Sequence, residues 1–352
     1  MLRPKLRASC AIRHHDLHYQ GGMTTEQLTK PELKELGHRI AVAQGNFFIK
    51  ELLRSSGAMI GTTKEDFAIN LASAIDDDVI TQEVLEAWLA EVEGWGDQHL
   101  YLVEPPQTEA AALAGGIAAS PHAGSLGATA SLDFPDMLEL KHIGLDAVGL
   151  SMVWYQRKEG WNRWRPKDFF SDEGLERYRF DAYRQRFDRS IVRYEWRFGD
   201  PYCAILIHRN TEIDHDAVFA DICAALAAIG CSDVPFTRIP LSQAVKVAAT
   251  KDKGLHSTRF ELDSGYVEMA STLPEGGIES VEPVRVVLHA VDASQFDRAL
   301  GMLHFAAEEH GMSRRIAVQV YGAEARLRIW AQCKRADVFQ ILKVLWGYNS
   351  EP

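Results

Sequence analysis

A stretch of small and turn-forming residues divides this chain into two parts of different character. Residues 104–135 are rich in Ala, Gly, Pro and Ser, from the pair Pro105 and Pro106 to Pro135. Few of them carry a side chain large enough to build a hydrophobic core, so we expect a flexible linker here. The chain has 352 residues, more than one core usually organises, so two or three domains are expected.

The part before the linker, residues 24–103, has the spacing of apolar residues that is typical of helices. Pro31 suits the first turn of one helix, and Thr63 with Asp66 three residues later predicts the capping box that opens another. Between residues 24 and 104 the chain has 6 Lys and Arg against 15 Asp and Glu, a net charge of −9. We therefore expect a compact domain of three or four helices whose acidic surface recruits a protein partner.

Residues 49–71 combine a helical segment that ends at Gly57, a short extended piece, and the turn Gly-Thr-Thr-Lys before a second helical segment. This order resembles the helix–extension–helix pattern of SAP-type domains. In that family, basic residues around the turn and the second helix contact DNA phosphates, and Lys64 matches such a position. The sequence departs from the pattern at Glu65 and at the acidic run 76–78. Because few cations would release counterions from DNA, a protein-interaction module is the alternative that suits this acidic surface.

After the linker, residues 136–352 alternate between strand-like and helix-like segments. We expect strands at 148–155, 191–198 and 202–208, a helix at 216–229, and a hairpin at 259–270. The last third is expected to contain a strand at 284–290, a helix at 294–309, strands at 316–321 and 326–331, and a closing helix at 338–346. This β-α-β-β-α order is the one found in ferredoxin-like (split βαβ) units, so the predicted class is α+β. A looser version of the same order earlier in the chain would give two such halves.

Residues 155–198 combine arginines with aromatic residues. They hold 12 Lys and Arg against 8 Asp and Glu, a net charge of +4 in a chain of formal charge −11. Strand alternation would place Arg189, Arg193 and Arg197 on one face of a sheet and Tyr194 and Trp196 on the other. The candidate residues for binding nucleic acid or another partner are Arg157, Lys158, Trp161, Arg163, Trp164, Arg165, Arg189, Arg193 and Arg197, together with Lys64.

Three roles fit such a combination of residues. Arginines bind phosphates and aromatic rings stack on bases, so the segment is a candidate nucleic-acid interface. The same residue types are enriched among the hot spots of protein–protein interfaces. Long arginine stems also lie over the edges of an aromatic core in a purely structural role. The sequence leaves these three roles open.

The sequence contains no complete catalytic or cofactor-binding motif, so we expect no catalytic residues, no metal and no cofactor. One segment gathers residue types that metal ions and acid–base catalysis use, with His208, Asp214 and His215 as its candidates. It falls between a predicted strand and a predicted helix, where Asp214 or Asp216 is favoured as a helix N-cap. The structural interpretation is therefore preferred to a catalytic one.

The ends of the chain and its cysteines indicate a compartment. Residues 1–22 are basic but lack the apolar core of a secretory signal, which leaves an organelle-type leader or an over-long start, and we favour a start at Met23. The five cysteines are scattered, which favours reduced thiols in the cytoplasm. No apolar run approaches the ~20 residues that span a bilayer, so no membrane association is expected.

These observations predict a non-enzymatic, modular binding or adaptor protein. Its acidic helical domain would recruit a protein, and its α+β domain would bind nucleic acid through the Arg/aromatic segment. One alternative is an oligomeric scaffold without a nucleic-acid role. A second is an enzyme of unfamiliar family with a site near His208, Asp214 and His215. The sequence leaves the oligomeric state open.

Overall fold

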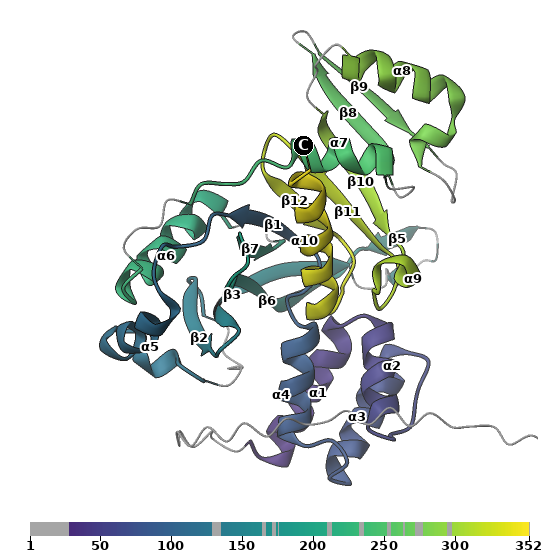
Figure 1. Ribbon diagram of the computed structural model, residues 1–352. Helices are drawn as coiled ribbons and strands as arrows, with labels where there is room; N and C mark the ends of the chain where they lie inside the picture. Colours follow the sequence, from purple (N-terminus) through teal and green to yellow (C-terminus); the bar gives the residue numbers. More distant parts are fainter. Residues whose placement is uncertain are drawn as a thin grey trace, which may run out of the picture.

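The computed structural model describes residues 28–128, 135–163, 167–170, 174, 176–209, 213–231, 236–251, 255–262, 265–271, 277–293 and 298–351 (Figure 1). The expectations for residues 1–22 and Met23 lie outside the described residues. The described chain has a mixed α+β fold, in which a ten-stranded antiparallel sheet is packed with helices.

Four helices precede the sheet: α1 (Lys30–Ala43), α2 (Asn46–Ser55), α3 (Lys64–Asp76) and α4 (Gln82–Val92). They share one hydrophobic core, in which Leu53, Phe67 and Leu71 are fully buried. The predicted capping box is present, because the Thr63 hydroxyl accepts from the Asp66 N–H and the Asp66 carboxylate accepts from the Thr63 N–H. We refer to α1–α4 as the N-terminal helices.

The strand β1 (Gln98–Val103) follows α4 directly and lies in the middle of the sheet. It pairs with β7 (Cys203–His208) on one side and with β12 (Arg326–Ile329) on the other. The complete order is β2-β3-β6-β7-β1-β12-β11-β10-β8-β9. The strand β1 therefore joins the earlier strands of the chain to the later ones.

The first half of the sheet contains two long strands. Its remaining elements are α5 (Ala110–Ala119), η1 (Ala123–Ser125), β2 (Glu139–Leu145), β3 (Gly149–Arg163), β6 (Tyr183–Arg197) and α6 (His215–Ala228). The strands β4 (Lys167–Phe170) and β5 (Arg177–Phe180) lie between β3 and β6 in the chain and form a separate two-stranded sheet. The strands β3 and β6 pair along their whole length, whereas β7 pairs with β6 only from Val192 to Glu195. The outer part of the β3–β6 ribbon, residues 156–163 and 183–190, thus extends beyond the neighbouring strand, and we call it the β3–β6 arm.

The second half of the sheet is built from shorter strands. Its elements are α7 (Ser242–Lys251), β8 (Leu255–Leu262), β9 (Gly265–Ala270), η2 (Ile278–Ser280), α8 (Glu282–Ala293), β10 (Arg298–Phe305), α9 (Ala307–His310), β11 (Ile316–Tyr321), β12 and α10 (Arg335–Asn349). In Figure 1, α10 crosses in front of β12 and β11, and α8 lies with β8 and β9 at the far end of the sheet from the N-terminal helices.

The helices cover opposite faces of the two halves. In the first half, α5 and α6 bury one face, to which β1 contributes Tyr101 and Val103. In the second half, α7 and α10 bury the other face, to which β1 contributes Leu100 and Leu102. Because successive strand residues point to opposite sides, β1 supplies side chains to both cores. The α5 and α6 side of the sheet continues into the second half. There, α7 and α10 pack on the opposite side.

The expected linker at residues 104–135 is wrong for its first part. Residues 110–119 form α5, and Leu113 and Ile117 are fully buried against the sheet. Alanine is the best helix former, so an Ala-rich stretch needs only two large apolar residues at helical spacing to dock. The strand β1 lies before this stretch, so the change from helices to sheet occurs near Gly94 and Gly96 instead of at residue 104.

The expected β-α-β-β-α order of the last third is wrong at its first two elements. The predicted strand 284–290 lies in α8, where the buried Leu288 and the partly buried Val284 are one helical turn apart. Residues 298–305 of the predicted helix 294–309 form the strand β10 instead, whose Leu303 and Phe305 alternate into the core, and the short helix α9 begins only at Ala307. The strands at 316–321 and 326–331 and the closing helix are present as β11, β12 and α10.

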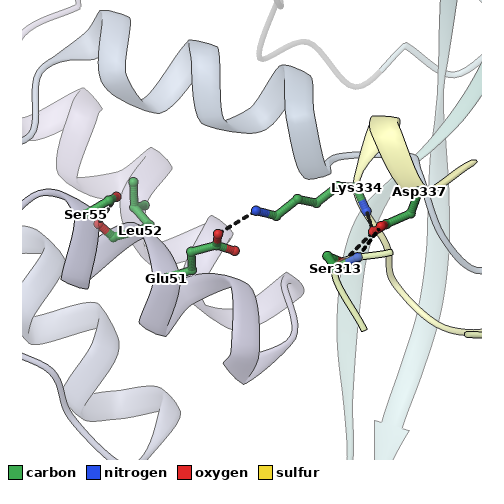
Figure 2. A network of polar contacts seen from close by, with 6 residues as sticks. All are labelled: Glu51, Leu52, Ser55, Ser313, Lys334 and Asp337. Atoms are coloured by element: carbon green, nitrogen blue, oxygen red, sulfur yellow. Dashed lines mark hydrogen bonds and ion pairs between the residues drawn. The ribbon is translucent and has the colours of Figure 1, made fainter. Parts of the chain in front are cut away.

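The N-terminal helices contact the end of the sheet through polar groups. Lys334 Nζ lies 2.5 Å from Glu51 Oε1 on α2. The Asp337 carboxylate accepts from the backbone N–H groups of Lys334 and Ser313 and from the Ser313 hydroxyl, which fixes the start of α10 beside that ion pair (Figure 2). The Gly45 N–H, between α1 and α2, donates to the Gln332 side chain at 2.5 Å. These contacts tie the N-terminal helices to the last third of the chain.

Candidate binding face of the sheet

The candidate arginines Arg189, Arg193 and Arg197 lie on one face of β6, as alternation predicts, but the side chains of Arg189 and Arg193 are buried. Arg189 Nη2 lies 2.5 Å from Glu93 Oε2 at the end of α4, and its guanidinium stacks 4.0 Å from the Tyr155 ring. Arg193 is 8% exposed, donates to the Glu93 carbonyl at 3.1 Å and stacks over Trp95 at 4.6 Å. At these two positions the arginines join the N-terminal helices to the sheet.

Arg197, the third arginine of this face, is exposed and lies 4.3 Å from the ring of Phe339 on α10. On the opposite face of β6, Tyr194 and Trp196 pack in the core beneath α5 and α6. The expected division of β6 into an arginine face and an aromatic face is therefore confirmed. Of the three arginines, Arg197 is the one that solvent can reach freely.

The remaining candidates of this segment lie along the β3–β6 arm. Arg157 pairs with Asp136 at 2.8 Å and with Glu159 at 3.1 Å. Lys158 donates to the Arg209 carbonyl at 2.6 Å, and Trp161 is 65% exposed near the end of the arm. Arg163 ends β3, but its side chain lies outside the described residues, as do Trp164 and Arg165.

Lys64, the position suggested by the SAP-like pattern, is half-buried. Its ammonium group donates to the Gln44 carbonyl, which joins the start of α3 to the loop between α1 and α2. The sequence pattern thus marks the start of a capped helix, and the lysine has a structural contact there.

An Arg/aromatic surface also occurs on a part of the sheet that the sequence did not single out. On β12 and just after it, Arg326, Arg328 and Trp330 alternate with the buried Leu327 and Ile329. They point away from α7 and α10, because the alternate residues lie in the core beneath those helices. We call this side of β12, β11, β10, β8 and β9 the open face.

Each arginine at this end of the open face lies over an aromatic ring. Arg326 is 4.1 Å from the ring of Tyr321 on β11, and Arg328 is 4.9 Å from the ring of Trp330. Arg326 also pairs with Glu324 at 2.6 Å. Trp330 is 36% exposed. The open face therefore combines cations with rings in the way that a stacking surface requires.

The far end of the open face repeats this arrangement. Arg259 on β8 lies 4.2 Å from the ring of Tyr266 on β9 and pairs with Glu268 at 3.0 Å. Tyr266 is 59% exposed. Cationic and aromatic groups thus extend from β12 to the edge strand β9.

Two histidines stack between these ends. The rings of His256 and His304 are 4.0 Å apart, and Arg315 Nη2 lies 2.5 Å from His304 Nδ1. Burial, with the charges of His256 and Arg315, lowers the pKa of His304 to about 4. His304 is therefore neutral near pH 7 and serves as a polar, stackable ring.

The residues considered for the enzyme alternative, His208, Asp214 and His215, are divided between the two faces of the sheet. His208 follows the alternation of Ala204 and Leu206 and faces the N-terminal helices, and burial lowers its pKa. His215 begins α6 on the other face, where its Nδ1 lies 2.6 Å from the Tyr101 hydroxyl. Asp214 caps α6, as its position predicted, by accepting from the Asp216 N–H. The three candidates therefore do not form one catalytic group.

His99 on β1 was not a sequence-based candidate. Its ring lies 5.2 Å from that of His215. Burial, together with the charges of Arg326, His215, Arg328 and Arg209, lowers the pKa of His99 to about 4. A signal for this end of the open face existed in the sequence, because Arg326 and Arg328 alternate with apolar residues and precede Trp330.

Among the described residues, no group of three or more His, Cys, Asp or Glu is placed to hold a metal ion. Within the same ranges, none of the helices has the length and apolar character that crossing a bilayer requires. A scan against protein-family models, a search of curated proteins and a search of solved structures each found no match.

Proposed function

We propose that this chain is a non-enzymatic, modular binding protein that takes single-stranded nucleic acid on the open face and a protein partner on its acidic helices. The observation that carries the first part is the Arg326, Arg328, Trp330 alternation on β12, with Tyr321 beside it. Unpaired bases stack on aromatic side chains and on guanidinium planes, and arginines also bind the phosphates between them. A sheet that presents rings and cations on one face suits an extended strand of nucleotides.

The residues of the open face favour a single strand over a duplex. The rings of Trp330 and Tyr266 are exposed, and the bases of a duplex would be stacked on one another and unable to reach them. The chain as a whole has a formal charge of −11, so attraction to nucleic acid is confined to this local surface. Binding is therefore expected to weaken steeply with salt.

The second part of the proposal concerns the N-terminal helices. Residues 24–104 have a net charge of −9, from 6 basic and 15 acidic residues. Exposed apolar side chains lie among these acids, including Met59, Ile60 and Ile69. Apolar groups surrounded by acidic ones suit a basic protein segment with an apolar face.

Fluorescence anisotropy with a labelled single strand of about 12 nucleotides tests the first part. We expect affinity to fall by a factor of ten or more between about 50 and 200 mM salt. Arg326→Gln with Arg328→Gln should reduce affinity and lower the salt slope by about 2, since each lost phosphate contact removes about 1. Arg285→Gln, on α8, is the matched control because this arginine pairs with Glu282 away from the open face. The absence of salt-dependent binding at low salt would refute the nucleic-acid role.

A second function, an oligomeric scaffold without nucleic acid, is favoured by one observation. Trp161 and Tyr183 are exposed near the end of the β3–β6 arm, where residues of this type serve as interface anchors. Light scattering after size-exclusion chromatography tests it with Trp161→Ser. A wild-type oligomer that becomes monomeric in this variant would support the scaffold, and a strictly monomeric wild type would exclude it.

A further inference from the structure

A cluster of basic groups lies at the border between the open face and α6. On neighbouring strands, His99 is directly opposite Arg328, and Tyr101 is directly opposite Arg326. Side chains at directly opposite positions have Cβ atoms about 5 Å apart, so the four share one surface. His215, at the start of α6, closes the border through its 2.6 Å contact with the Tyr101 hydroxyl.

Two further arginines flank this cluster. Arg209 directly follows β7, and it continues the alternation that places Ile205 and Ile207 on the α6 side of the sheet. Its backbone N–H donates to the Asp97 carbonyl, which keeps it beside the start of β1. Arg238 lies 5.0 Å from the ring of Tyr101. The arginines therefore come from three separate parts of the chain.

The acids near the cluster neutralise only part of it. Arg326 pairs with Glu324 and Arg238 pairs with Asp216, both through exposed carboxylates. Within the described ranges, Arg328 and Arg209 have no carboxylate partner. The third acid, Asp214, is used in capping α6. Positive charge consequently remains beside His99.

Unused hydrogen-bonding atoms lie in the same place. His99 Nδ1 and Arg326 Nε are buried, and neither has a hydrogen-bond partner among the described residues. A buried polar atom without a partner is costly, so an external acceptor at this position would stabilise the folded chain. Since the lowered pKa of His99 keeps its ring neutral, the ring can donate one hydrogen bond while the charge comes from arginines.

We propose that His99, Arg209, Arg326 and Arg328 form a binding site for a phosphate group. A phosphate carries several acceptor oxygens in a tetrahedral arrangement, so it can accept from guanidinium forks that approach from different strands. A carboxylate has only two oxygens, and its acceptor sites lie in one plane, so it suits donors that approach from several directions less well. That the phosphate belongs to a nucleic acid rests on the proposed function. That the site binds a phosphate group at all does not.

The test uses the full-length chain with isotope-labelled histidine rings, observed by NMR. Inorganic phosphate, adenosine monophosphate and a short single-stranded oligonucleotide are titrated separately, with acetate as the control anion. We expect the His99 and His215 signals to shift saturably with all three phosphate compounds and not with acetate. Arg328→Gln should weaken phosphate binding about tenfold, because it removes a charge-assisted hydrogen bond. Arg209→Gln, at an exposed position, is the second variant, and Arg285→Gln is the control.

The outcomes separate the site from the proposed function. If inorganic phosphate shifts His99 but the oligonucleotide does not compete with it, the site stands and the nucleic-acid role is overturned. The opposite outcome is that the oligonucleotide binds in a salt-dependent way, inorganic phosphate does not shift the His99 signal, and Arg328→Gln does not change the affinity for inorganic phosphate. In that case the site is overturned and the function stands. If neither compound binds, both are overturned.

Discussion

At the scale of single residues, β6 contains two buried charged side chains whose contributions to stability depend on each other. Arg193 and Glu195 are two positions apart on the same face and are 8% and 4% exposed. Burial raises the pKa of Glu195, while Arg193, Arg335 and a 2.7 Å hydrogen bond from Ser151 favour its charged form. Removing one member of a buried charged pair leaves the other uncompensated. Each residue is therefore expected to depend on its partner.

Arg193→Leu is expected to lower the free energy of unfolding by about 3 kcal/mol, because it removes the buried cation that most favours the charged form of Glu195, which then keeps only its 3.5 Å contact with Arg335. Adding Glu195→Gln to this variant should recover part of the loss, since the uncompensated charge is then absent. Urea denaturation followed by tryptophan fluorescence measures both. An equal loss in the single and the double variant would contradict the coupling.

The pKa of His99 makes stability depend on pH in a defined direction. Because its pKa falls from 6.5 to about 4 on folding, the unfolded chain binds more protons between these values. Stability should therefore decrease as the pH falls from 6.5 toward 4. His99→Gln should weaken this decrease, whereas His289→Gln, exposed on α8, should not. Urea midpoints at neutral pH and at about pH 5 measure the difference, and identical profiles for wild type and His99→Gln would refute it.

At the scale of elements, local patterns predicted what local chemistry controls. The capping box of Thr63, the Asp214 cap of α6 and the alternation of β6 depend on residues close in sequence, and all are present. The exposure of Arg189 and Arg193 depends on Glu93 and Trp95, about a hundred residues earlier, and no local pattern carries that information. The open face was missed for the same reason, since which side α10 covers is a tertiary property.

The helix α5 provides a test at this scale, because its sequence resembles a linker. Leu113→Ala should lower the free energy of unfolding by about 2–4 kcal/mol, as expected for a fully buried leucine. Ala114→Ser, at an exposed position of the same helix, should change it by less than about 0.5 kcal/mol. Urea denaturation compares the two. Equal stability of both variants would mean that α5 does not pack on the sheet.

At the scale of the whole molecule, the helical and sheet parts are one structure. Trp95 is fully buried against Phe339, and the Cys333 thiol donates to the Trp95 carbonyl, so the junction after α4 lies inside the C-terminal core. A division of the chain at residues 104–135 would leave β1 with the helices and remove the central strand from the sheet. The boundary suggested by composition is therefore not a place to separate domains.

Residues 136–352 expressed alone should fail to fold, because β7 and β12 would each lose a partner strand and both cores would lose side chains from β1. Near-ultraviolet circular dichroism and proteolysis measure this, with the full chain as the control. Adding residues 1–135 in trans on a second chain should restore part of the signal. A protease-resistant fragment with native dichroism would contradict the expectation.

The central position of β1 also sets the order of events during synthesis on the ribosome. Gln98 pairs with Ile329, which is 231 residues later (329 − 98). The strand must therefore leave the exit tunnel long before its second neighbour exists, and one of its edges remains unpaired until almost the entire polypeptide has emerged. Closure over so long a span is entropically slow, so nascent chains that stall before β12 should be the ones that chaperones retain.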